Sequence, residues 1–552
     1  MSETHMRRID SLHLPSEKII LLYAAAYFLI TLGIHLAFFP IGDIGVESDF
    51  YGELVVAAKE LVRHNFSVSN YPYKGPFYSF ALVSIHLFCR DWYLSGVLLN
   101  ALCAAASLIV IFRLLSNVFD RKIALLATFA VSLGYEFFTL SHKASSDMLF
   151  LFLCYCSISV LLMERFSRRR LIVGGILSAF AFLTRYTGIC LPVALIAVLL
   201  INPGRWSRRR CRVAAVMYLA IFFAVCAPWF IKNINETGSL LATRNIENVV
   251  REFYGDRKAG DIPEGGFKSI LQVFTHNPAY FVKHYLLSIA KHFWTDMTTF
   301  LALEGILVML GIVRLFFRPP TRKQWAFLAF PICYFLVICN VFPLSRFSLP
   351  LSPAYFAILF SMLLAMGEIS RFPLIGKPKQ TGKQKSETAQ KKRKKSSSGD
   401  PPAMTVASGF RAIKITTALI IVALFCYQIM VIVKAESYYY GQRPVFILEA
   451  AQFLKEHAAQ EHRAERAIVL ARKPHIAYYS GLIYKQYPPS LANLREFIVF
   501  ARNQNVDYIV YSDIERSYYE DAAGRQPLDT IEGIKRIYSL SSITIYELNR
   551  RN

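Results

Sequence analysis

The chain alternates between long apolar segments and short polar ones over most of its length. The first apolar run extends from Ile19 to Phe39, and about 20 apolar residues suffice to cross a bilayer as a helix. Comparable runs follow at residues 93–115, 122–140, 147–164, 170–186, 187–202, 212–231, 299–317, 325–342, 346–367 and 412–434. We therefore predict a polytopic α-helical membrane protein with about eleven transmembrane helices.

Three segments between these spans are predicted to lie at the membrane surface. Residues 51–64 place apolar side chains on one helical face and charged ones on the other, which is typical of an interfacial helix. Asn277-Pro278 opens a second amphipathic helix that runs to about Trp294. Residues 77–88 are apolar but too short to cross, so we expect a re-entrant or interfacial element.

The basic residues predict the orientation in the membrane, because cytoplasmic loops carry an excess of Lys and Arg. Arg7, Arg8 and Lys18 precede the first helix and place the N-terminus in the cytoplasm. If residues 77–88 do not cross, the basic clusters at 121–122, 168–170, 205–212, 314–323 and 377–395 all face inward. Residues 41–75, residues 232–298 and the C-terminal region then lie outside, which predicts a multi-pass protein of the cell inner (cytoplasmic) membrane.

The composition changes after the last core span. We predict a transmembrane core over 1–367, a disordered basic cytoplasmic linker over 368–411 and a last transmembrane helix over 412–434. The run Lys391 to Lys395 could also be read as a nuclear-localisation signal, but a linker near anionic lipid is the stronger interpretation.

Residues 435–552 have a soluble pattern that predicts a small α/β domain outside the membrane. Strands are expected at 467–471, 507–511 and 542–548, and helices at 445–460, near 491–504 and at 529–535.

Charge and cysteine content narrow the functional class. The formal net charge is +24, but the basic residues lie in clusters between apolar segments, so nucleic-acid binding is the weaker explanation. The ten cysteines lie almost wholly in or beside apolar segments, and Cys154-Tyr155-Cys156 lacks the spacing of a zinc site. We interpret them as small membrane hydrophobes.

Ionisable residues of the membrane region collect at the predicted outer ends of the helices. They are Asp49, Lys74, His142, Lys143, Asp147, Arg185, Arg244 and Arg346. Ion-coupled transporters place their charges near the midplane instead. A ring of acids and bases at the interface suits chemistry on an anionic, phosphate-bearing lipid.

Each of these side chains also has a structural interpretation. Asp49 and Asp147 could cap the helices beside them. Lys74 could extend towards lipid headgroups, and Arg346 could neutralise a lipid phosphate without a catalytic role. His142 fits a hydrogen-bonded interface residue better than a metal ligand.

Several motifs in order resemble the GT-C-fold glycosyltransferases of the protein-mannosyltransferase and aminoarabinose-transferase group. The motifs are Ser48-Asp49-Phe50-Tyr51, Tyr73-Lys74-Gly75-Pro76-Phe77-Tyr78, Asp147-Met148-Leu149-Phe150, Phe182-Leu183-Thr184-Arg185-Tyr186, Pro228-Trp229 and Ser345-Arg346-Phe347-Ser348-Leu349-Pro350. The stretch from Ala471 to Gly481 is similar to a soluble domain appended to many bacterial members.

The resemblance implies transfer of a sugar from a polyprenyl-phosphate donor to a hydroxyl outside the membrane, usually with inversion. It assigns Asp49 as the catalytic base and Lys74, then Arg346, as cations that stabilise the leaving phosphate. The remaining expected residues are Arg185 and Arg244 for donor binding, with Asp147, Tyr51 and His142 in supporting positions.

Two departures from the family pattern bear on cofactors. Tyr73 stands before Lys74 where one branch has Glu, and Phe50 rather than an acid follows Asp49. We therefore expect transfer without a metal or other cofactor, to a lipid, glycan or protein acceptor. Two other functions remain open: a flippase or transporter of lipid-linked sugars, and a membrane-anchored glycan-binding protein.

Overall fold

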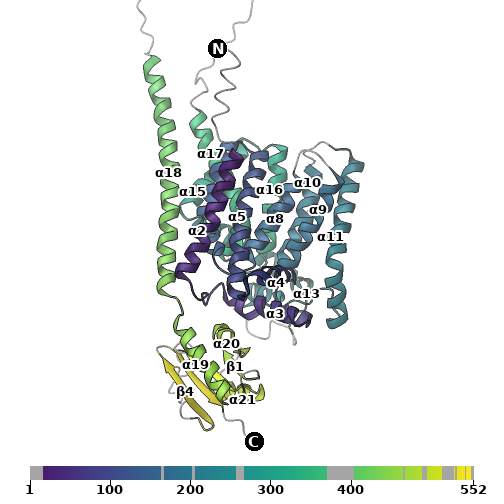
Figure 1. Cartoon of the computed structure of the whole chain (residues 1–552). Helices are drawn as coiled ribbons and strands as arrows, with labels where there is room; N and C mark the ends of the chain where they lie inside the picture. Colours follow the sequence, from purple (N-terminus) through teal and green to yellow (C-terminus); the bar gives the residue numbers. More distant parts are fainter. Residues whose placement is uncertain are drawn as a thin grey trace, which may run out of the picture.

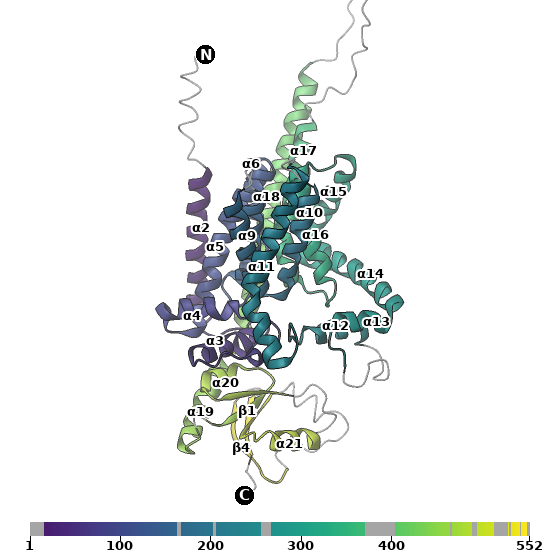
Figure 2. The same ribbon diagram turned by 90° about the vertical axis from the view of Figure 1, so that its right-hand side faces the viewer.

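The chain folds into a helical bundle with a small β-sheet unit at one end (Figures 1 and 2). The computed structural model describes residues 16–162, 167–201, 206–255, 266–369, 403–463, 466–487, 494–512, 528, 531–540 and 543–548. Most of the predicted linker lies outside these residues. We call the end of the bundle that faces the sheet the sheet end, and the other, where α2 begins and α17 ends, the opposite end.

The predicted spans coincide with helices or with a bent pair of helices. They are α2 (Ser16–Phe38), α5 (Trp92–Val118), α6 (Arg121–Leu133) with α7 (Tyr135–Ser141), α8 (Asp147–Leu161), α9 (Arg168–Thr184), α10 (Cys190–Ile201), α11 (Arg208–Thr237), α15 (Leu303–Phe317), α16 (Arg322–Ile338), α17 (Ser352–Ile369) and α18 (Ala403–Gly441). Within the described residues, five helices are long and apolar enough to cross a membrane, or six if the bent pair counts as one span. The multi-pass architecture is confirmed, while the number of crossings stays a prediction.

Short elements cover the sheet end of the bundle. Residues 77–88, expected not to cross, form α4 (Phe77–Cys89), which lies across this end beside α3 (Val55–Val62) (Figure 2). A π-helical turn, η1 (Phe50–Leu54), leads into α3, and η2 (Val68–Asn70) follows it. A helix is therefore present in the segment predicted at residues 51–64, with a π-helical first turn, and its place at the membrane surface stays a prediction.

The long loop after α11 is also helical. It contains α12 (Asn245–Tyr254), α13 (Ile270–His276) and α14 (Pro278–Thr295), followed by the π-helical turn η5 (Asp296–Phe300). Asn277 caps α14 by accepting a hydrogen bond from the Tyr280 N–H at 3.0 Å, as the Asn-Pro signal predicts. Two 3₁₀ turns, η3 (Tyr186–Ile189) and η6 (Ser345–Leu351), precede α10 and α17.

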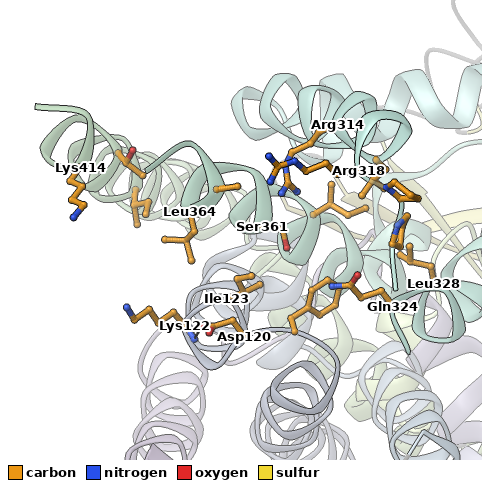
Figure 3. Close-up of a pocket in the computed structure, with 18 of the residues that line it drawn as sticks. Asp120, Lys122, Ile123, Arg314, Arg318, Gln324, Leu328, Ser361, Leu364 and Lys414 are labelled. Carbon is orange, nitrogen blue, oxygen red and sulfur yellow. Dashed lines mark hydrogen bonds between the residues drawn. The ribbon is translucent and has the colours of Figure 1, made fainter. Parts of the chain in front are cut away.

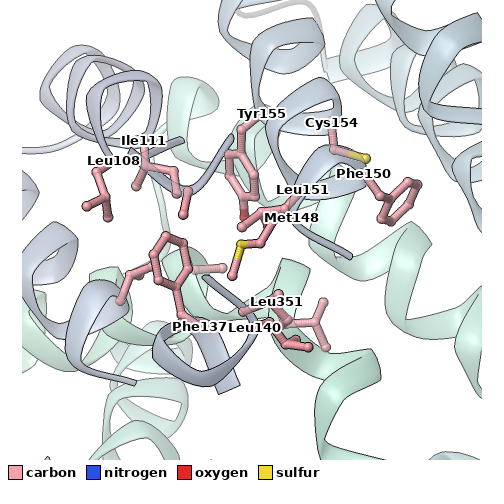
Figure 4. Close-up of a cluster of buried hydrophobic side chains, with 14 of the residues drawn as sticks. Leu108, Ile111, Phe137, Leu140, Met148, Phe150, Leu151, Cys154, Tyr155 and Leu351 are labelled. Carbon is pink, nitrogen blue, oxygen red and sulfur yellow. The ribbon is translucent and has the colours of Figure 1, made fainter. Parts of the chain in front are cut away.

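A tightly packed apolar cluster supports these turns from inside the bundle. Figure 4 shows Leu108 and Ile111 facing Phe137, Met148 and Leu351, side chains contributed by α5, α7, α8 and η6. The buried Tyr155 hydroxyl donates to the Pro350 carbonyl at 2.7 Å and ties α8 to η6. Because packed interiors deform little, this cluster gives the polar residues at the sheet end a rigid base.

The C-terminal unit is a five-stranded mixed sheet with helices on both faces. Its strands are β1 (Ile468–Ala471), β2 (Ile483–Gln486), β3 (Tyr508–Ser512), β4 (Ile534–Leu540) and β5 (Ile543–Leu548), in the order β2-β1-β3-β5-β4. The pairs β1–β2 and β1–β3 are parallel, and β5 is antiparallel to β3 and β4.

Alternation along the strands assigns side chains to the two faces of the sheet. Val469 and Ala471 pack with α19 (Phe446–Gln460) and α20 (His475–Ser480), whereas Leu470 packs with α21 (Leu494–Asn503). The three predicted strands and the helices at 445–460 and 491–504 are confirmed.

The predicted helix at 529–535 is wrong. Residues 531–533 form a turn, and Ile534 begins the edge strand β4, which among the described strands pairs only with β5. Lys535 and Arg536 lie on its exposed positions, so β4 lacks the continuous apolar run of a central strand. The other edge strand, β2, is only four residues long and was not expected.

Candidate active site

Asp49 lies at the centre of a charged cluster at the sheet end. It immediately precedes η1, and its carboxylate accepts from Lys74 Nζ at 3.4 Å and from an Arg346 guanidinium nitrogen at 3.1 Å. The Asp49 side chain is 41% exposed, whereas those of Lys74 and Arg346 are 11% and 18% exposed. The carboxylate is thus the accessible member of a group whose cations are largely buried.

Glu53 is the closest partner of Lys74. Its carboxylate accepts from Lys74 Nζ at 2.8 Å and from the backbone N–H groups of Tyr73 and Lys74 at 3.1 and 3.2 Å. One acid therefore holds both the charge and the backbone of the lysine. The sequence did not indicate this role, because an ordinary α-helix over residues 51–64 would place Glu53 on the charged face, directed away from the apolar side chains.

The Lys74 turn also rests on the end of α9. A Cβ at Gly75 would lie 2.2 Å from the Leu183 carbonyl oxygen, so only glycine fits at this approach. The Tyr186 hydroxyl donates to the Lys74 carbonyl at 3.3 Å and accepts from Trp229 Nε1 at 3.2 Å. These contacts join three of the sequence motifs in one turn.

Asp147 and Arg185 form a second buried pair beside the first. Asp147 begins α8, Arg185 follows α9, and their charged groups lie 2.6 Å apart. Ser146 also accepts from Arg185, at 3.3 Å. Next to Arg346, Ser345 donates to Glu136 on α7, another acid that the sequence did not single out.

The charges of the cluster determine the ionisation of its members. Burial opposes ionisation of Asp49, but Lys74 and Arg346 outweigh it and hold the pKa of this carboxyl well below its ordinary value. Burial likewise opposes a charged Lys74, yet Glu53 and Asp49 raise the pKa of its ammonium group. Both groups are therefore charged at neutral pH.

Arg346 has spare hydrogen-bonding capacity. One terminal nitrogen donates to Asp49, while its Nε is buried and has no hydrogen-bond partner within the described part of the chain. A buried, unpaired donor is costly unless a ligand or water satisfies it. An incoming anionic oxygen could fill this role.

The remaining candidate residues lie outside the cluster. Arg244 is 60% exposed and pairs with Glu247 at 2.7 Å, although its backbone N–H donates to the Pro72 carbonyl just before the Lys74 turn. His142 is buried beside α18, 3.3 Å from Glu436, and its Nδ1 lies 3.1 Å from the Phe138 carbonyl. These contacts fit the interface interpretation of His142.

The structural interpretations of three other residues find no support in their contacts. Among the described residues, Asp49 makes no side-chain capping hydrogen bond. Asp147 is the first residue of α8, after the N-cap position of Ser146, and its carboxylate pairs with Arg185. Lys74 turns inward to Glu53 instead of extending towards headgroups.

Tyr51 connects the site to the C-terminal unit. Its hydroxyl accepts from the Gly42 N–H at 3.0 Å and lies 2.9 Å from the Tyr479 hydroxyl. Its ring packs against His475 and Tyr478, with centroids 4.4 and 4.7 Å away. We call residues 472–480 the docking segment, because they bring the sheet unit onto the loop that precedes Asp49.

His475 and Lys473 extend this contact. Burial lowers the pKa of His475 to about 4. The ring is therefore neutral at neutral pH, and its Nε2 lies 2.9 Å from the Asp43 carbonyl. Burial also lowers the pKa of Lys473, while Asp49 and Asp43 act in the opposite direction. The sheet unit thus supplies a partly buried cation near Asp49, which the sequence had not indicated.

A second acid-base group anchors the same loop from the bundle side. Lys143 Nζ pairs with Asp43 at 2.6 Å, and Glu47 accepts from the backbone N–H groups of Asp43 and Ala144 at 2.8 and 2.7 Å. Burial raises the pKa of Glu47 to about 7. The loop carrying Asp49 is therefore held on two sides.

Comparisons with known proteins support the predicted class. The sequence profile of the family described as dolichyl-phosphate-mannose-protein mannosyltransferase matches residues 74–231. This segment contains Lys74, Asp147 and Arg185 but not Asp49 or Arg346. No curated protein sequence matches the chain.

Solved structures show the fold. ArnT from Cupriavidus metallidurans, bound to undecaprenyl phosphate, is 12% identical with a TM-score of 0.54, covering 96% of this chain and 97% of its own. The oligosaccharyltransferase AglB from Archaeoglobus fulgidus, in complex with an inhibitory peptide and a dolichol-phosphate, is 14% identical with a TM-score of 0.57, covering 91% and 70%. The predicted GT-C fold is confirmed, and the family match indicates a glycosyltransferase.

Proposed function

We propose that this membrane protein transfers a sugar from a polyprenyl-phosphate donor to a hydroxyl of a lipid, glycan or protein acceptor. The observation that carries the proposal is the accessible Asp49 carboxylate between the largely buried cations Lys74 and Arg346. ArnT and AglB, whose fold this chain shares, were each solved with a polyprenyl or dolichol phosphate.

In the proposed reaction, the acceptor oxygen attacks the anomeric carbon of the donor sugar. The bond from that carbon to the phosphate oxygen breaks, and its electron pair leaves on polyprenyl phosphate. Asp49 accepts the proton of the hydroxyl or orients it. Arg346 and Lys74 stabilise the phosphate oxygens, with Arg346 Nε as a donor still unpaired within the described residues.

Donor binding also changes the basicity of Asp49 in this proposal. Without ligand, Lys74 and Arg346 hold the Asp49 pKa low, which makes this carboxylate a weak base. A phosphate bound to the same cations adds negative charge beside Asp49 and raises its pKa. The site then becomes a better proton acceptor only when the donor is present.

We propose transfer without a metal ion. The nearest carboxylates already have cationic partners: Asp49 and Glu53 pair with Lys74, and Asp147 pairs with Arg185. Positive side chains can neutralise the phosphate in place of a divalent ion. Purified protein dialysed against EDTA should keep its transfer rate, and a rate restored only by a divalent cation would contradict this part of the proposal.

The proposed location is the outer face of the bacterial inner membrane. The basic loops around 121–122, 168–170 and 314–323 lie at the opposite end of the bundle from Asp49 and the sheet unit (Figure 1). By the positive-inside rule that end faces the cytoplasm.

The central test is mass spectrometry of envelope lipids and glycoproteins from cells that express wild-type protein or Asp49→Asn. We expect the variant to lose the added sugar. Asp91→Asn is a matched control, because Asp91 is an exposed N-cap of α5 and Asn also caps well. Identical glycan profiles for wild type and Asp49→Asn, at equal protein levels, would remove Asp49 from catalysis.

A further inference from the structure

A large cavity lies at the opposite end of the bundle, far from Asp49. Its volume is about 720 Å³, and residues of α6, α15, α16, α17 and α18 line it. Figure 3 shows Arg314 and Arg318 from the end of α15 near one wall, with Lys122 and Lys414 towards the other. The apolar part of the lining includes Leu315, Leu328, Ile358, Leu364 and Ile421.

The cavity has excess positive charge. Its lining holds four cationic side chains, Lys122, Arg314, Arg318 and Lys414, against a single carboxylate, Asp120. Among the described residues, none of the four cations forms a salt bridge. The Asp120 carboxylate accepts a hydrogen bond from the Lys122 backbone N–H at 2.7 Å and caps α6. Four cations therefore line one cavity without a salt-bridge partner among the described residues.

We propose that this cavity binds the headgroup of an anionic membrane phospholipid. The four cations suit phosphate oxygens, and the apolar residues below them suit acyl chains. Phe316 and Phe317, beside Arg314 and Arg318, are 83% and 81% exposed. Large apolar side chains exposed beside the two arginines favour lipid over water as the neighbour of the cavity.

The charge of the neighbouring chain segment argues against the protein filling the cavity with its own residues. The segment that joins α17 to α18 connects two helices of the cavity lining, but it contains the run Lys391-Lys392-Arg393-Lys394-Lys395. This run has the same sign as the cavity lining and cannot neutralise it. A phospholipid supplies the missing negative charge and the apolar surface together.

The test uses full-length purified protein and native mass spectrometry. The protein is incubated with phosphatidylglycerol, with phosphatidylcholine or with inorganic phosphate alone. Wild type should retain phosphatidylglycerol in preference to phosphatidylcholine, and Arg314→Gln with Arg318→Gln should retain about tenfold less of it. The matched control is Arg208→Gln with Arg209→Gln, which removes two exposed charges at the same end, from α11.

A second variant pair protects the test against a folding defect on α15. Lys122→Gln with Lys414→Gln removes two charges from different helices and should cause a similar loss. Equal retention of the two lipids by wild type, or an equal loss in the α11 control, would overturn the proposal. Retention of inorganic phosphate by wild type as strong as its retention of phosphatidylglycerol would also overturn the proposal, because the site would then bind free phosphate.

Discussion

Lys74 links the acids of the candidate site. It pairs with Glu53 at 2.8 Å and with Asp49 at 3.4 Å, and its backbone is fixed by the same Glu53. Removing one member of a buried ion pair typically costs about 3–5 kcal/mol, because the other charge stays buried without a partner. The cluster is therefore both a stability element and the proposed place of reaction.

The same substitution at Arg346 and at Arg244 should affect the transfer rate differently. Arg346→Met removes a largely buried donor to Asp49 and should lower kcat by about 10²–10³-fold, as for other transition-state donors. Arg244→Met breaks only an exposed pair with Glu247 and should change the rate less than about threefold. Steady-state transfer assays on both variants check this. Equal losses would place Arg244 in the site as well.

Glu47 should make the stability of the protein depend on pH. Burial raises its pKa from 4.5 to about 7, so folding favours the neutral acid. The contribution is complete below about pH 4.5 and is lost as pH rises through 7, by up to about 3 kcal/mol. Thermal unfolding between pH 4.5 and 7.5 should therefore show a flatter profile for Glu47→Gln than for wild type.

The control for this measurement is Glu60→Gln, which removes an acid from an exposed pair with Arg63. Its pH profile should parallel that of wild type. Parallel profiles for wild type and Glu47→Gln would show that Glu47 titrates as an ordinary glutamate.

At the scale of single residues, sequence reasoning located the main charges but not all of their partners. Asp49, Lys74 and Arg346 come together, and so do Asp147 and Arg185. Glu53 was missed because η1 is a π-helical turn. Such a turn has more residues than an α-helical one and shifts the angular positions of the side chains. A helical wheel drawn with the usual period therefore places Glu53 on the wrong face.

At the scale of elements, apolar length predicted the helices well and packing decided the exceptions. Residues 122–140 read as one span, but the chain bends by 63° between α6 and α7 at Gly134. The edge strands β2 and β4 were missed because they are half-exposed and lack the apolar run of β3. The sequence of a short segment does not show which element will pack beside it at the edge of a sheet.

The docking segment gives an element-scale prediction. His475→Ala removes the contact with the Asp43 carbonyl and the ring that packs on Tyr51. Amide hydrogen exchange in residues 43–51 should become faster, because the loop loses one of its two supports. The control is His457→Ala, which changes a histidine of α19 paired with Glu547. Unchanged exchange in the His475 variant would contradict docking at this position.

At the scale of the whole molecule, the sequence predicted a membrane bundle and a separate α/β unit but not their contact. The two tyrosines that meet in this contact, Tyr51 and Tyr479, are 428 positions apart. Nothing in either local pattern indicates such a partner. The contact depends on the three-dimensional arrangement alone.

The proposed orientation can be tested on the intact protein. The sheet unit lies at the same end of the bundle as Asp49, opposite the basic loops (Figure 1). If the basic loops face the cytoplasm, as proposed, the C-terminus lies outside it. Alkaline phosphatase fused after Asn552 should be active, and a green fluorescent protein fusion at the same position should be dark. The opposite pair of results would reverse the orientation and move the site to the cytoplasmic face.

The docking segment also relates the order of synthesis to the assembly of the candidate site. Residues 472–480 leave the ribosome long after the bundle helices, yet they complete the packing around Tyr51 and the loop before Asp49. A nascent chain that has inserted only its first helices holds this loop from the bundle side alone, through Glu47 and Lys143. The loop before Asp49 therefore gains its second support only after residues 472–480 have been synthesised and have docked on Tyr51 and Asp43.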